Sequence, residues 1–139
     1  MTNRVRSQPI LAVNDVPKSS AFYAELLGLE ATSQKMKSDH AWLYDRLMDG
    51  DRLVLQLHCW DEEAHPNLVR EPNHRAGYGV LVWFELDDFD AAVARARRMK
   101  VEIVEDVHRS PAPQHREMWL RDPDGYVVVL CSPDGESPS

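Results

Sequence analysis

The stretch LAVNDV at residues 11–16, followed by SAFY at residues 20–23, has the pattern of a strand, a turn and a helix start. FELDDF at residues 84–89, followed by VARA at residues 93–96, repeats that pattern, and Leu86 stands 73 positions after Val13 (86 − 13 = 73). The offset holds at the far end of each half, where Val129 corresponds to Gln56 (129 − 56 = 73). Separated segments that share one offset indicate a duplicated module. Two such modules predict pseudo-twofold symmetry, with a ligand-binding cleft between the halves.

The composition is that of a soluble globular protein. The 139 residues are 43% hydrophobic and 28% charged, which suits one compact domain over residues 1–139. Its expected parts are module 1 at about residues 4–60, a linker at 61–79, module 2 at 80–132 and a flexible tail at 133–139. The net charge of −7 disfavours nucleic acid as a partner. Without a signal peptide or an apolar run of membrane-spanning length, we expect no membrane association and a cytoplasmic location.

The two cysteines, Cys59 and Cys131, both lie in apolar sequence at predicted strand ends. Packed thiols in a reducing cytosol are favoured over a disulfide.

Turn and cap signals divide the first module. A strand is predicted over residues 4–13, Asp15 caps the following helix, and Gly28 ends it. Further strands are predicted over residues 30–34, 41–46 and 53–59, with a hairpin turn at 49–51.

The second module repeats this order. Asp88 caps its helix, and Lys100 stands where a helix-ending glycine is expected. Strands are predicted at residues 80–86, 101–106, 117–120 and 126–131, with a turn at 122–125. The predicted fold class is α+β, with two βαβββ modules. Each is a curved mixed sheet with a helix on its convex face, and together they form the cleft.

Several of these segments together resemble the vicinal oxygen chelate superfamily of glyoxalases, bleomycin-resistance proteins and extradiol dioxygenases. They are VND at residues 13–15 with SAFY at 20–23, the stop at Gly28, and RDPDGY at 121–126. In catalytic members, two side chains from each module hold a divalent metal. The resemblance places these four positions at Gln8, Gln56, Leu81 and Val129.

This set of four is a poor metal site. Divalent cations bind through several oxygen or imidazole donors, and anionic carboxylates supply much of the affinity. Two neutral amides facing two aliphatic side chains lack that chemistry, so we expect no metal and no cofactor. The segments QPIL at residues 8–11, VWF at 82–84 and HREMWL at 115–120 resemble the metal-free bleomycin-resistance branch. Proteins of that branch are acidic dimers that sequester a cationic glycopeptide without catalysis.

Strand alternation identifies the side chains that share a face with the four family positions. The predicted ligand-binding residues are Gln8, Trp42, Tyr44, Gln56, His58, Trp83, Glu85, His115, Glu117 and Trp119. Aromatic rings with a few polar groups suit a small organic molecule of cationic or aromatic character.

The favoured function is therefore metal-independent binding of a small molecule by a homodimer, in sequestration of an antibiotic or a toxic metabolite. The alternatives are two kinds of enzyme that use the same cleft. One is a metal-dependent lyase, isomerase or dioxygenase. The other is a metal-free acid/base enzyme, for which Glu117, Glu85 and either His58 or His115 are the candidate groups.

Overall fold

The chain folds into two compact units, each built around one four-stranded sheet. The computed structural model describes residues 4–32, 43–60, 65, 67–70, 76–111 and 114–136. The first unit comprises Met1–Ala24 and Gly28–Arg70, and the second comprises Glu25–Leu27 and Glu71–Ser139.

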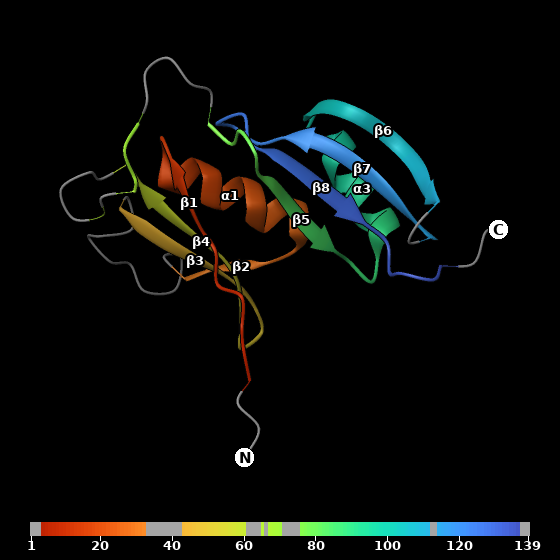
Figure 1. The fold of residues 1–139 in the computed structure, drawn as a ribbon, viewed down its shortest axis with the longest axis horizontal. Helices are drawn as coiled ribbons and strands as arrows, with labels where there is room; N and C mark the ends of the chain where they lie inside the picture. The colour runs from red at the N-terminus through yellow and green to blue at the C-terminus, as the bar shows by residue number, and fades with distance from the viewer. Residues whose placement is uncertain are drawn as a thin grey trace. The chain divides into compact units, whose positions relative to one another are not determined.

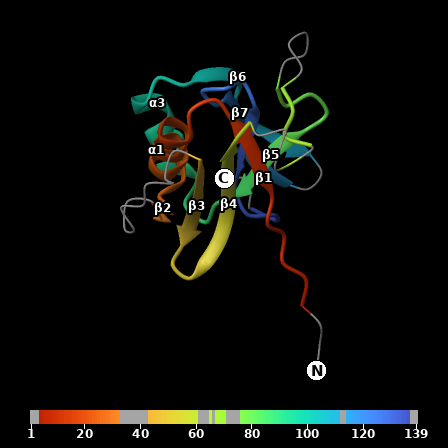
Figure 2. The same cartoon turned by 90° about the vertical axis from the view of Figure 1, so that its left-hand side faces the viewer.

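The sheet of the first unit has the order β1-β4-β3-β2 (Figures 1 and 2). Strand β1 (Ile10–Val13) runs parallel to β4 (Arg52–Cys59), and β4 runs antiparallel to β3 (Tyr44–Asp49), which pairs with β2 (Glu30–Ala31). Helix α1 (Val16–Leu27) follows β1. Its Ser20 hydroxyl donates to the buried Asp45 carboxylate of β3 at 2.5 Å, which ties the helix to the sheet.

The sheet of the second unit has the equivalent order β5-β8-β7-β6 (Figure 1). Strand β5 (Leu81–Glu85) runs parallel to β8 (Val127–Cys131), which pairs antiparallel with β7 (Gln114–Arg121), and β7 pairs antiparallel with β6 (Glu102–Pro111). Helix α3 (Phe89–Arg98) packs against β8.

Residue-level pairing repeats between the units with the offset found in the sequence. Ile10 pairs with Gln56 in the first unit, and Trp83 pairs with Val129 in the second (10 + 73 = 83; 56 + 73 = 129). The α+β class and the duplicated module are thereby confirmed.

Helices α1 and α3 both start at the predicted aspartates. The Asp15 carboxylate accepts from the backbone N–H of Lys18 at 3.0 Å, and Asp88 accepts from Ala91 at 3.0 Å. Gly28 ends α1 with φ of 70°. Lys100, which follows α3, has φ of 56°, so a lysine adopts the left-handed conformation that glycine adopts after α1.

Burial alternates along the central strands as predicted. Leu55 and Leu57 of β4 are fully buried, whereas Gln56 and His58 between and after them are partly exposed. The Cys59 and Cys131 thiols are both free; Cys131 is buried as predicted, whereas Cys59 is partly exposed.

Several strand boundaries were predicted wrongly. Strand β7, predicted over residues 117–120, begins at Gln114, and β2, predicted over residues 30–34, ends at Ala31. The first strand begins at Ile10, not at residue 4. Among the described residues, the only backbone ladder bond to residues 4–9 runs from the Gln56 N–H to the Pro9 carbonyl at 3.1 Å. The third strand of the first module, predicted over residues 41–46, continues to Asp49 as β3 (Tyr44–Asp49), and residues 41–42 lie outside the described residues. Strand β6 continues to Pro111 because it pairs with β7 along almost its whole length.

Candidate functional site

One face of the second sheet carries two cross-strand rows of side chains. Strand register places Val129 between Trp83 and Trp119 in the first row. The second row is Glu85, Cys131 and Glu117. This row face, defined by these six residues, contains four of the predicted ligand-binding residues. His115 is the fifth predicted ligand-binding residue of this unit. It contacts the row face, since its ring centroid lies 5.9 Å from the ring centroid of Trp83.

Both indoles of the row face are held by hydrogen bonds. The Trp83 N–H donates to the Cys131 sulfur at 3.0 Å, and the Trp119 N–H donates to Glu117 Oε1 at 2.9 Å. The Trp83 residue nevertheless remains 44% exposed. A large apolar ring is therefore held in one orientation at the surface, where a ligand can stack on it.

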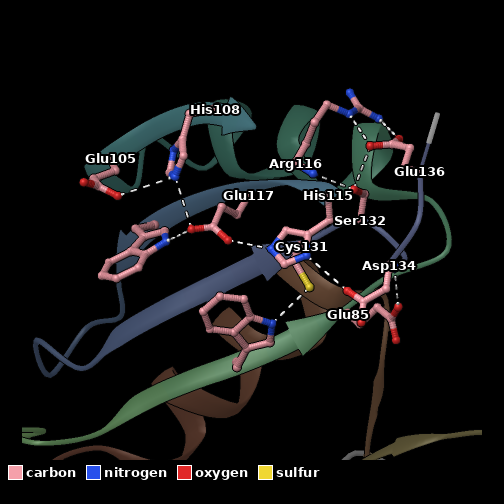
Figure 3. A network of polar contacts seen from close by, with 12 residues as sticks. Glu85, Glu105, His108, His115, Arg116, Glu117, Cys131, Ser132, Asp134 and Glu136 are labelled. Atoms are coloured by element: carbon pink, nitrogen blue, oxygen red, sulfur yellow. Dashed lines mark hydrogen bonds and ion pairs between the residues drawn. The ribbon is translucent and has the colours of Figure 1, made fainter. Parts of the chain in front are cut away.

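Glu117 is the centre of a buried polar network (Figure 3). Its Oε2 lies 2.6 Å from His115 Nε2, and its Oε1 lies 3.1 Å from His108 Nε2. The other ring nitrogen of His115 lies 3.1 Å from Asp134 Oδ1. A buried imidazole thus bridges two carboxylates, while His108 extends the network toward solvent.

The network favours the charged forms of its members. Burial raises the pKa of Glu117, but the hydrogen bonds from His115, Trp119 and His108 outweigh it, and the pKa lies below its usual value. For His115, burial lowers the pKa, but the bonds to Glu117 and Asp134 outweigh it and the pKa is raised. The pKa of His108 is also raised, chiefly through its hydrogen bond with the Asp106 backbone.

Three members of this network are not among the ligand-binding residues predicted from the sequence. They are His108, Asp134 and Glu105, whose carboxylate lies 3.7 Å from His108. A predicted strand extended past residue 106 would have paired His108 with Glu117. Asp134 was missed because it lies beyond the last strand, in the segment taken to be a flexible tail. Its backbone N–H donates to Glu85 at 3.2 Å.

The predicted residues of the first unit form a separate polar group. The Tyr44 hydroxyl donates to Gln56 Oε1 at 2.5 Å, and the Gln56 amide N–H donates to the Gln8 backbone carbonyl at 3.0 Å. The His58 ring lies 6.1 Å from the Tyr44 ring and 4.5 Å from the His65 ring. Trp42 lies outside the residues that the structure describes.

The four family metal positions do not fit a divalent cation. The Gln56 oxygen already accepts from Tyr44, Leu81 is aliphatic, and Val129 is fully buried in the row face. Across the described parts of the chain, no group of three or more His, Cys, Asp or Glu side chains is placed to hold a metal ion.

Comparison with known proteins assigns the family. Residues 5–130 match the model of the Glyoxalase/Bleomycin resistance protein/Dioxygenase superfamily, so the chain belongs to that superfamily. No curated protein matches the chain.

Solved structures agree with the fold. A protein of unknown function from Agrobacterium tumefaciens is 23% identical, with 96% of this chain and 97% of that chain covered and a TM-score of 0.72. A lactoylglutathione lyase from the same organism is 22% identical, with 94% and 95% covered and a TM-score of 0.66. TioX from Micromonospora sp. ML1 is 15% identical, with 93% and 98% covered and a TM-score of 0.69. At these identities the likeness concerns the fold alone.

Among the described helices, none combines the length and apolar character required to cross a membrane.

Proposed function

We propose that this chain is a metal-independent small-molecule-binding protein that holds a cationic or aromatic organic molecule against the row face. Sequestration of an antibiotic or a toxic metabolite is the corresponding role. The observation that carries the proposal is Trp83, a residue 44% exposed whose N–H is fixed by Cys131. An oriented, accessible indole offers stacking area at little further cost in conformational entropy.

The charge around Trp83 supports a cationic ligand. Glu85 is exposed in the second row, two residues after Trp83, whereas the negative charge of Glu117 is balanced by His115 and His108. Carboxylates beside an aromatic ring attract a cation, which also interacts favourably with the ring face.

Binding can be tested by a thermal-shift screen of cationic glycopeptides, catechols, fosfomycin and glyoxal–thiol adducts, followed by calorimetric titration of any hit. Trp83→Ala should weaken binding by about 2 kcal/mol, on the scale of an aromatic hot spot. Tyr78→Ala is the matched control, because Tyr78 is an 80% exposed aromatic of the same unit outside the row face. Equal losses in the two variants would contradict the proposed site.

The metal-dependent enzyme alternative has its own test. Protein purified without a histidine tag should carry no stoichiometric transition metal by elemental analysis, because the donor set at Gln8, Gln56, Leu81 and Val129 is unsuitable. About one ion per chain, lost in Gln8→Ala or Gln56→Ala, would support a metal-dependent lyase, isomerase or dioxygenase instead.

A second candidate function is metal-free acid/base catalysis, favoured by the arrangement of His108, Glu117 and His115. The His108 side chain is 39% exposed and lies 3.1 Å from Glu117, so a proton can pass between solvent and the buried carboxylate. Mass spectrometry of a hit after incubation separates the two functions. An unchanged ligand supports sequestration, whereas conversion that is lost in Glu117→Gln supports the enzyme.

A further inference from the structure

The first unit contains a hollow of about 940 Å³ whose lining is rich in arginine. It lies between the arm of residues 4–8 and the β3–β4 hairpin, both visible in Figure 2. Its charged lining residues are Arg4, Arg6, Arg46, Arg52 and Asp51.

The charge of this lining is opposite to that of the protein. Four guanidinium groups and one carboxylate give +3 (4 − 1 = 3), whereas the whole chain carries −7. Like charges gathered around one space repel each other, and an anion placed among them relieves that repulsion.

The guanidinium groups have few partners of their own. Within the described residues, the side chains of Arg4, Arg6 and Arg46 make no ion pair or hydrogen bond. Arg52 lies 3.6 Å from Asp49, but these side chains are 80% and 62% exposed, so the pair is weak. The donors of Arg4, Arg6 and Arg46 are therefore available to a ligand.

Arg46 and its counterpart in the second unit are side chains of different chemistry. It pairs with Gln56 across the sheet, and its counterpart in the second unit is Trp119 (46 + 73 = 119), which pairs with Val129. The hollow also includes Gln8. After the duplication, one sheet face thus carries indoles, and its counterpart carries a guanidinium beside two amides.

We propose that this hollow binds a small organic anion through carboxylate or phosphate oxygens held by Arg4, Arg6 and Arg46. Guanidinium groups match the planar geometry of such oxygens and form charge-assisted, often bidentate hydrogen bonds. The hollow is open to solvent and larger than one phosphate group, so it has room for the organic body of such an anion. This site lies within the first unit and goes beyond the function proposed for the row face.

The test uses the full chain and two probes, pyrophosphate and citrate, titrated separately by calorimetry at low salt. At least one should bind, and added sodium chloride should weaken it. Tighter binding of pyrophosphate assigns a phosphate ligand, and tighter binding of citrate assigns a polycarboxylate. Binding of neither probe at about millimolar concentration would overturn the proposal.

Two variants locate the binding. Arg46→Met and the double variant Arg4→Gln/Arg6→Gln should each raise the Kd about tenfold or more, as expected for lost hydrogen bonds to a charged ligand. The arm residues are exposed, so the double variant keeps the fold even if Arg46→Met does not. The control Arg98→Met, at an exposed arginine of α3, should leave the Kd unchanged. An unchanged Kd in the double variant, or equal losses in Arg98→Met, would overturn the assignment.

Discussion

At the scale of single residues, His115 is a buried titratable group of the polar network centred on Glu117. It is 3% exposed, and each of its ring nitrogens faces a carboxylate oxygen. The pKa of His115 is raised above 6.5 in the folded protein. Protonated His115 therefore stabilises the fold fully at pH values below 6.5, and this stabilisation is lost as the pH rises through the folded pKa. Glu117, with a lowered pKa, contributes above its unfolded pKa and loses that contribution as the pH falls. The network therefore stabilises the fold most at pH values between the unfolded pKa of Glu117 and the unfolded pKa of His115.

A histidine titration by NMR should show this directly, with the resonance assigned by its loss in His115→Asn. We expect the pKa of His115 to lie above 6.5 in the wild type and to fall in Glu117→Gln, which removes its closest anion. Asp134→Asn is the control and should lower the pKa less, because the Asp134 side chain is 68% exposed and screened by water. An unchanged pKa in Glu117→Gln would show that the network does not control this proton.

A second prediction concerns two neighbouring glycines. Gly77 and Gly79 both have positive φ, at 89° and 75°. A Cβ on Gly77 would lie 2.7 Å from Cδ1 of the buried Tyr126 ring, whereas a Cβ on Gly79 would meet nothing within 4 Å. Gly79→Ala should cost about 1 kcal/mol of unfolding free energy from the backbone alone, and Gly77→Ala about 2 kcal/mol or more because the clash is added. Urea denaturation of the two variants measures the difference, and equal losses would contradict the clash.

At the scale of elements, helices α1 and α3 end differently. Gly28 ends α1, and Lys100 takes the left-handed conformation after α3 with a φ of 56°. A Cβ in this region is strained against the backbone, and glycine removes that strain.

Lys100→Gly should therefore stabilise the protein by about 0.5–1 kcal/mol, even though glycine increases the entropy of the unfolded chain. Lys100→Ala keeps the Cβ and should change stability little, which separates the backbone effect from the loss of charge. Thermal unfolding measures both variants. A lower melting temperature in Lys100→Gly than in Lys100→Ala would refute the strain argument.

At the scale of the whole molecule, exposed strands and apolar side chains favour assembly. The outer strand β6 is exposed along most of its length, and Ile103, Val104 and Val107 on it are 37–41% exposed. On the opposite edge of the same sheet, Leu81 is 46% exposed. Open sheet edges of this kind invite pairing with another chain.

We therefore predict a homodimer at micromolar concentration. Multi-angle light scattering should give twice the chain mass. A monomer over the full concentration range would contradict the prediction and would leave these edges without a partner.

The sequence by itself determined the duplication, the α+β class, the helix caps and the alternation of buried and exposed strand residues. These features depend on nearest neighbours and on regular periods. Asp15 and Asp88 cap the helices that immediately follow them, and Leu55 and Leu57 are buried because they alternate with polar neighbours. The match of Val13 with Leu86 is likewise a property of the chain alone.

Only the tertiary structure decided which side chains meet. His108 reaches Glu117 because β6 continues beyond its predicted end, and Asp134 reaches His115 across 19 positions of sequence. The arginines of the hollow come from the N-terminal arm and from the hairpin of β3 and β4. These contacts depend on strand length, register and the path of irregular segments. Non-local packing sets all three, so the periodicity of the sequence does not encode them.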